Sequence, residues 1–571
     1  MLEVVLVVRR ALIAALAGLA LAPAAASACT KTWVGTTNAN WSVAANWSSG
    51  VVPGPADVVC IGPGTTETVA NISGGVTVRA VRSERPLRNS TALTITDASE
   101  PSTFTSLTTS GAFSIAGDLV ADAVTFSSAV TYGGDIDTSA LTQTGNSVTG
   151  DGDIRTRTWT WNGGSLYGSG TLTVTEQHTL LGNLSSMGLR DGRRLVTHGT
   201  GSWSGNLTLY GTAVWTNHAA VTVIGGSLGG TVVDGARPEL HNAGSITRAT
   251  GDYSMSGVAV DNDGLIEATG PANLITINAG TGESGGRFVG VRMSAEPFRV
   301  GASASIDRMT VGGRLIVPDD AVLDIANLTI AGGVIEGGAT VRLRGHFWAY
   351  YGSFGGGGMT AILPPDATME WTHAFGLHVK RFESWGDITV TETGLGRPDT
   401  TWGPRTVWEN YGKVTLVSGL FPVRAGDEAG RIVNHGTFTK TSTSAFTIRP
   451  VIFNDGVIDI QRGQITATRF EQTPNGTLRF DLGGANEFGR LSASAFLYSG
   501  RLEATLTPGY TPAPGNRFPV VTAAGSGLFH STGLAGLALE ESQTGSLGLV
   551  ATTPHSGPDV KQASPGLDAA P

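Results

Sequence analysis

The chain has 571 residues and a net charge of −9, and 40% of its residues are hydrophobic, which is too apolar for a disordered chain. Its 81 glycines follow no three-residue period, which excludes a collagen-like chain, and the lack of a basic patch with interleaved aromatic residues argues against a nucleic-acid partner. Short alternations of Thr, Ser, Gly, Val, Leu and Ile after residue 30 indicate an all-β protein.

Residues 1–28 have the pattern of a secretory signal peptide. Arg9 and Arg10 precede an apolar run over residues 11–21, and the small residues 26–28 form a cleavage site. No later stretch is long and apolar enough to cross a bilayer as a helix. We therefore expect a secreted, extracellular or cell-surface protein with no membrane-spanning segment after the signal peptide.

Only two cysteines, Cys29 and Cys60, occur in the sequence. In an oxidising compartment they predict a disulfide that ties the new N-terminus to the first structural unit. The alternative is a lipid-modified Cys29 at that terminus. The residue three positions before it is Ala26, where lipoprotein signals usually have leucine, so the disulfide is favoured.

A tripeptide of asparagine, any residue and glycine recurs along the chain, each time followed by alternating apolar positions. With two looser copies, Asn217-His218-Ala219 and Ser384-Trp385-Gly386, the copies within each of two groups are 20 to 26 residues apart, which is typical of the coils of a solenoid. Asn and Gly tolerate the left-handed backbone region, so we expect each pair to form a tight corner. The predicted corners are Asn242 and Gly244, Asn262 and Gly264, Asn410 and Gly412, Asn434 and Gly436, and Asn454 and Gly456.

The residues after each corner predict a strand with one buried face. Val414 and Leu416 alternate with Thr415, and Ile458 and Ile460 alternate with Asp459. A corner and a strand in each coil, stacked on the next coil, bury a continuous apolar column. The pattern predicts a right-handed parallel β-helix (a β-solenoid) over residues 100–480.

The two ends of this region resemble a known group of proteins. The tryptophan-rich segment "TWVGTTNANWSVAANWSSGVVPGPADVVCIG" (residues 32–62) is similar to the opening module of bacterial secreted and cell-surface β-helix proteins, the adhesin-like and autotransporter-passenger-like proteins. Residues 491–529 look like their closing segment. The resemblance implies an N-terminal β cap at 29–99 and a C-terminal β cap at 481–552. It departs from autotransporters at residues 553–571, where a Pro-rich polar tail that we expect to be disordered stands in place of the C-terminal barrel.

No cluster of residues in the sequence predicts a catalytic centre, a metal site or a cofactor. The densest acidic group, Asp319, Asp320 and Asp324, lies in "VPDDAVLDIANLTI" and is typical of a turn that leads into a strand. The histidines nearest the repeated motif lie at or beside corners, so we interpret them as surface residues; they are His218, His241 and His435.

Aromatic residues concentrate between residues 346 and 385, within about two coils. Exposed aromatic rings on a rigid β surface suit the binding of sugar rings. The candidate carbohydrate-binding residues are Trp348, Tyr350, Tyr351, Trp371 and Trp385. The alternative is that these rings stack inside the coils, as the sequence around Trp161 also suggests.

These patterns favour a non-catalytic surface protein with a structural or adhesive role. Its expected partners are extracellular glycans or the surface of a host or neighbouring cell. Two alternatives stay open: a carbohydrate-binding protein, and a polysaccharide lyase or glycoside hydrolase whose acidic residues converge from distant coils.

Overall fold

The computed structural model describes residues 27–35, 38–63, 70–72, 74–182, 187–278, 283–294, 297–356, 358–373, 375–391, 405–421, 430–534, 536–542 and 546–552. The predicted signal peptide, except residues 27 and 28, and the predicted tail at 553–571 lie outside these residues. The chain divides into two compact units: the first contains residues 1–220 and 225–238, and the second contains residues 221–224 and 239–571.

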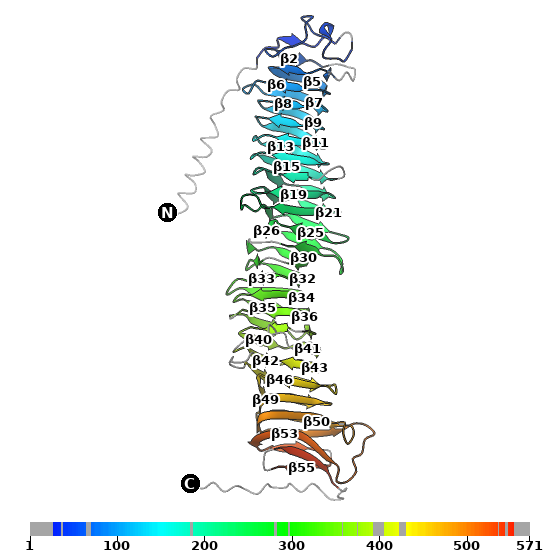
Figure 1. Cartoon of the computed structure of the whole chain (residues 1–571), viewed down its shortest axis with the longest axis vertical. Helices are drawn as coiled ribbons and strands as arrows, with labels where there is room; N and C mark the ends of the chain where they lie inside the picture. The colour runs from blue at the N-terminus through cyan, green and yellow to red at the C-terminus, as the bar shows by residue number, and fades with distance from the viewer. Residues whose placement is uncertain are drawn as a thin grey trace, which may run out of the picture. The chain divides into compact units, whose positions relative to one another are not determined.

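The fold is a β-solenoid of stacked parallel strands, as the sequence predicts. In the first unit the long strands β7 (Ser102–Thr109), β9 (Leu119–Phe126), β11 (Ile136–Gln143) and β13 (Ile154–Trp161) pair in parallel and in register, one coil above the next (Figure 1). Among the described residues the only helix is a single 3-10 turn, Ala44–Asn46. The right-handed sense of the coils and the two caps stay predictions.

From β7 to β13 the coils of the first unit are shorter than the sequence repeat indicates. The backbone amide of Asp135 donates to Asp118 Oδ1, 17 residues earlier, at 2.8 Å, and that of Asp153 donates to Asp135 Oδ1, 18 residues earlier, at 2.9 Å. Each aspartate follows a glycine, in "GDL", "GDI" and "GDI". These corners lack the Asn-x-Gly motif, so the spacing of 20 to 26 residues does not reveal them.

The predicted tryptophan-rich segment packs beside the first coil. Trp33, Trp41 and Trp47 are buried and meet edge to face, with ring centroids 4.9 and 4.7 Å apart. Cys29 and Cys60 form a disulfide, with their Cα atoms 5.7 Å apart.

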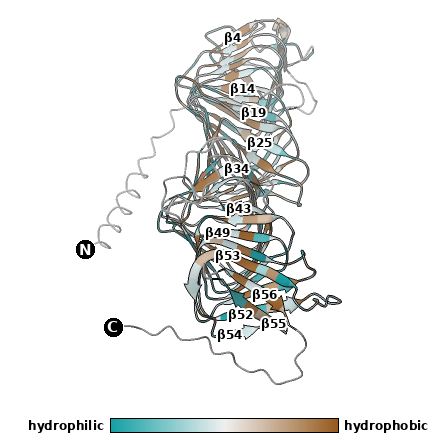
Figure 2. Cartoon of the chain, turned by 60° about the horizontal axis from the view of Figure 1, so that its bottom comes forward, coloured by the Kyte–Doolittle hydropathy of each residue, from teal (hydrophilic) through white to brown (hydrophobic). Residues whose placement is uncertain are grey.

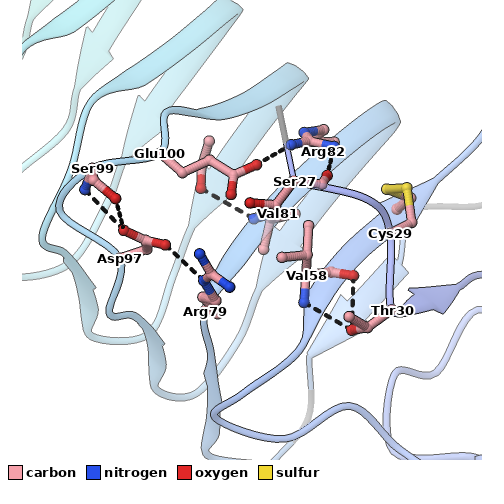
Figure 3. Close-up of polar contacts among 12 residues, drawn as sticks. Ser27, Cys29, Thr30, Val58, Arg79, Val81, Arg82, Asp97, Ser99 and Glu100 are labelled. Atoms are coloured by element: carbon pink, nitrogen blue, oxygen red, sulfur yellow. Dashed lines mark hydrogen bonds and ion pairs between the residues drawn. A yellow bond between two sulfur atoms is a disulfide. The ribbon is translucent and has the colours of Figure 1, made fainter. Parts of the chain in front are cut away.

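Polar contacts fasten the described start of the chain to the strands below it (Figure 3). Thr30 Oγ1 accepts a hydrogen bond from the amide of Val58 at 2.9 Å. The Arg82 guanidinium donates to the Ser27 carbonyl at 2.6 Å and pairs with Glu100. These contacts join residues on both sides of Cys29 to β2 (Val58–Ile61) and β5 (Ala80–Asn89).

In part of the second unit the Asn-x-Gly motif marks the coils. The strands that end in the motif's asparagine pair in register, with Asn410, Asn434 and Asn454 aligned; they are β42 (Val407–Asn410), β44 (Arg431–Asn434) and β47 (Val451–Asn454). Apolar and polar residues alternate along strands such as β43 (Lys413–Phe421) and β49 (Gln464–Gln472) (Figure 2). The inward residues form the core of the coils.

The corner residues work differently from the expectation. None of the ten predicted corner residues has a positive φ. The asparagine side chains instead point inward, and those of Asn410, Asn434 and Asn454 are fully buried. Asn410 Nδ2 donates to Asn434 Oδ1, and Asn434 Nδ2 to Asn454 Oδ1, each at 2.9 Å, so one buried amide ladder links successive coils.

The corner glycines are required by close approach and not by a left-handed backbone. A Cβ on Gly436 would lie 2.1 Å from the carbonyl oxygen of Gly412, and one on Gly456 would lie 2.2 Å from that of Gly436. At these corners the glycine of one coil therefore packs directly against the backbone of the coil before it.

Candidate binding surface

The structure separates the five predicted carbohydrate-binding residues into three environments. Trp348, Tyr351 and Trp385 are exposed, with 42%, 38% and 45% of their surface accessible. Tyr350 is half-buried. Trp371 lies inside the coils, 2% exposed, with its ring centroid 5.5 Å from that of Phe375 and 5.2 Å from that of Phe421. Trp371 therefore belongs to the core, as the alternative interpretation allowed.

The strand β36 (His346–Phe354) positions three of these rings. Phe347 and Ala349 point inward and Trp348 points outward, as strand alternation requires. The pairing of β36 with β34 (Val322–Glu336) then shifts register, because Ile330 pairs with Ala349 but Ala331 pairs with Tyr351. This bulge inserts Tyr350 and lets Tyr351 face outward as well.

A histidine of the next coil completes this group. The His373 ring lies 4.0 Å from that of Tyr350 and 4.8 Å from that of Tyr351. Tyr350 meets Trp348 and Tyr351 nearly edge to face, at 63° and 84°. We call Trp348, Tyr350, Tyr351 and His373 the β36 aromatic cluster. The ring contacts within the cluster are edge-on or tilted and not stacked, and Trp348 and Tyr351 stay exposed.

A threonine fixes the orientation of two members of the cluster. The indole N–H of Trp348 donates to Thr372 Oγ1 at 3.3 Å, and His373 Nδ1 lies 3.2 Å from the same oxygen. Thr372 and His373 were not among the binding residues predicted from the sequence. The only sequence signal for these two residues was their position directly after Trp371, the last residue of β38 (Thr368–Trp371).

Trp385 belongs to a different surface. Its ring stacks on Tyr411 at 4.1 Å and 11°, and Tyr411 stacks on His435 at 4.8 Å and 12°. These three residues, which we call the corner column, each follow a residue of the buried ladder: Asn410, Asn434, or Ser384, whose hydroxyl donates to Asn410 Oδ1 at 2.9 Å. Tyr411 stacks against two rings and Trp385 against one, so part of the ring surface of the column is covered.

Charged groups brace the corner column. Tyr411 donates to Glu409 at 3.1 Å, and the Arg381 guanidinium pairs with Glu409 at 2.5 Å. Burial opposes ionisation of Glu409, but these hydrogen bonds outweigh it and hold the pKa of the carboxyl below its ordinary value. Glu409 is therefore a structural anion and not a proton donor.

The acidic and histidine candidates do not converge. Asp324 pairs with Arg344 at 2.6 Å, and Asp320 takes a left-handed backbone, φ 59°, as a turn residue does. His241 contacts Glu239 and Asp261, and His435 contacts Asp455. Among the described ranges, no three His, Cys, Asp or Glu residues are grouped so that they could hold a metal ion.

Comparison with known proteins found no match. No family model, no curated protein and no solved structure matches the chain. In the part of the chain that the structure describes, no helix combines the length and the apolar character needed to cross a bilayer.

Proposed function

We propose that the protein is a secreted or cell-surface β-solenoid of bacterial, adhesin-like type that attaches to extracellular glycans through the β36 aromatic cluster. One observation carries the proposal: Trp348 and Tyr351 keep their rings exposed on a rigid sheet, where edge contacts and a bulge hold them in place. Aromatic rings of this kind combine an apolar face for a sugar ring with a polar group at the rim.

The cluster also supplies polar partners for sugar hydroxyls. The hydroxyls of Tyr350 and Tyr351 and the imidazole of His373 can each donate or accept a hydrogen bond. Because the cluster spans two successive coils, β36 and the residues after β38 (Thr368–Trp371), it suits an extended chain better than a single sugar. The role is attachment, with the solenoid as the support.

The secreted or cell-surface location rests on the sequence and on one covalent feature. Residues 1–28 have the features of a signal peptide, and the Cys29–Cys60 disulfide suits an oxidising compartment. Fractionation of the producing cells tests the location. Mature protein beginning near Cys29, outside the cytoplasm, is expected, and full-length protein retained in the cytoplasm would contradict it.

The binding proposal is tested on a panel of immobilised glycans with the purified mature protein. We expect saturable binding to at least one extended glycan, weakened about tenfold by Trp348→Ala because the ring face is lost. Trp385→Ala is the matched control, since this tryptophan is equally exposed but stacked. Equal losses in the two variants, or no glycan bound by the wild type, would contradict the proposal.

A further inference from the structure

A buried lysine lies beside two serines in the second unit. Lys440 ends the strand β45 (Thr437–Lys440), and its side chain is fully buried. Its Nζ donates to Ser442 Oγ at 2.8 Å, to the Ser442 carbonyl at 2.6 Å and to the Val417 carbonyl at 3.1 Å. Ser442 Oγ lies 2.8 Å from Ser444 Oγ, and Ser444 is exposed. The three polar groups thus form a continuous chain from the interior to the surface.

The carbonyl oxygen of Val417 has more donors around it than it can accept. Lys440 Nζ, Ser442 Oγ and Ser444 Oγ all lie within hydrogen-bond reach of this oxygen, which has two lone pairs. At least one of these three donors must therefore form its hydrogen bond with another acceptor. The hydroxyl of Ser444 can donate to Ser442 Oγ, and that of Ser442 to Lys440 Nζ when the amine is neutral.

We propose that Ser444, Ser442 and Lys440 act as nucleophile, proton relay and base in acyl transfer from carboxylic esters. Ser444 Oγ attacks the ester carbonyl while its proton passes to Ser442 Oγ and the Ser442 proton passes to Lys440 Nζ. The tetrahedral intermediate collapses, the C–O bond to the alcohol breaks, and Lys440 returns the proton to the leaving alkoxide through the same relay. Water then hydrolyses the acyl-Ser444 bond by the same steps and releases the acid.

The environment of Lys440 suits a base. Burial lowers the pKa of its amine to about 8, so a useful fraction is neutral near pH 7. The flanking strands β43 and β48 (Val457–Ile460) each carry one charged residue. Lys413 is exposed at the far end of β43, where it pairs with Thr437, and Asp459 accepts a hydrogen bond from Gln461 at 3.0 Å. Neither charge contacts the amine.

An exposed nucleophile at a coil corner fits an ester carried on a larger molecule. Nothing in this inference depends on the β36 aromatic cluster, so glycan binding and acyl transfer can fail separately. A fluorophosphonate probe tests the relay directly, because Ser444 Oγ would displace fluoride from phosphorus and form a stable phosphonate ester. We expect a mass increase of one probe per chain, mapped to Ser444.

Three variants separate the proposed roles. Ser444→Ala should abolish labelling, and Lys440→Arg should slow it by about a hundredfold, because arginine keeps the charge but does not accept a proton. Thr443→Ala, in the same exposed turn, is the matched control and should label like the wild type. The wild-type labelling rate should rise with pH around the Lys440 pKa of about 8.

Several results would overturn the proposal. They are no labelling of the wild type, a label on another residue, or equal labelling in Ser444→Ala and Thr443→Ala. Because Ser444 is exposed, its alanine variant should fold like the wild type, which circular dichroism checks. Labelling that persists at the wild-type rate in a folded Lys440→Arg protein would reduce Lys440 to a structural residue.

Discussion

Two corners, one in each unit, are held by different side chains. In the first unit, exposed aspartates such as Asp118 and Asp135 accept a hydrogen bond from a backbone amide of the next coil. In the second, buried asparagines such as Asn434 both donate to and accept from the neighbouring coils. A buried polar group costs much more when it loses its partner than an exposed one does. The corner at Asn434 should therefore be far less tolerant of substitution than the corner at Asp135.

The largest effect is expected from Asn434→Leu, a change of similar size. It removes the acceptor of Asn410 Nδ2 and the donor to Asn454 Oδ1, and leaves both groups buried without that bond. We expect a loss of roughly 4 kcal/mol in the local free energy of unfolding. Hydrogen exchange of the peptides around β44 and β47 measures it, with exposed His435→Ala as the control. Protection equal to that of the control would refute the ladder's role.

The next effect is confined to the first unit and depends on pH. His178 is buried, neither ring nitrogen has a hydrogen-bond partner, and burial lowers the pKa of its imidazole from 6.5 to about 4. The unfolded chain therefore takes up the proton first as the pH falls. The first unit should keep its full stability above pH 6.5 and lose roughly 3 kcal/mol as the pH falls to 4.

The substitution His178→Phe tests this dependence. The variant should lose less stability between pH 7 and pH 4.5 than the wild type, because it has no imidazole to protonate. Denaturant unfolding at the two pH values, followed by hydrogen exchange in the first unit, gives the comparison. An unchanged pH dependence would assign the acid sensitivity to other groups.

A smaller effect is expected at a corner glycine of the second unit. Gly436→Ala places a Cβ 2.1 Å from the Gly412 carbonyl oxygen, so the coils must separate locally. We expect a loss of about 2 kcal/mol. Gly62→Ala is the control, because a Cβ there meets no atom within 4 Å. Thermal unfolding curves that coincide for the two variants would disprove the close approach.

The smallest effect is expected at an exposed corner of the first unit. Asp135→Ala removes one hydrogen bond to the amide of Asp153, which water can replace, so we expect a loss of about 1 kcal/mol or less. Asp135→Asn keeps the acceptor oxygen and should match the wild type. A loss as large as that of Asn434→Leu would erase the contrast between the two corners.

The same contrast shows what the sequence could predict. The Asn-x-Gly spacing predicted the coils around Asn242 and Asn262 and those from Asn410 to Asn454 correctly, since a strong motif marks each of them. It missed the shorter coils of the first unit, because aspartate after glycine is too common to stand out. The inward direction of Asn434 was not predictable either. A one-dimensional pattern does not tell whether asparagine is chosen for its backbone or for its side chain.

The candidate surface was predicted in part for a similar reason. Alternation in β36 places Trp348 outside, and the sequence shows it. The bulge that turns Tyr351 outward depends on pairing with β34, and the burial of Trp371 depends on Phe421, about two coils further along the chain. These contacts between distant residues have no local signature in the sequence. The same holds for His373, which joins the cluster by contacting Tyr350 and Tyr351 of the coil before it.

Hydroxyl-radical footprinting tests the central claim most directly, once a glycan is bound. Trp348 and Tyr351 are accessible to oxidation in the free protein, and so is Trp385. We predict that the glycan lowers oxidation of Trp348 and Tyr351 in proportion to occupancy while oxidation of Trp385 stays constant. Protection of Trp385 alone, or no protection at Trp348 under saturating glycan, would contradict binding at the β36 aromatic cluster.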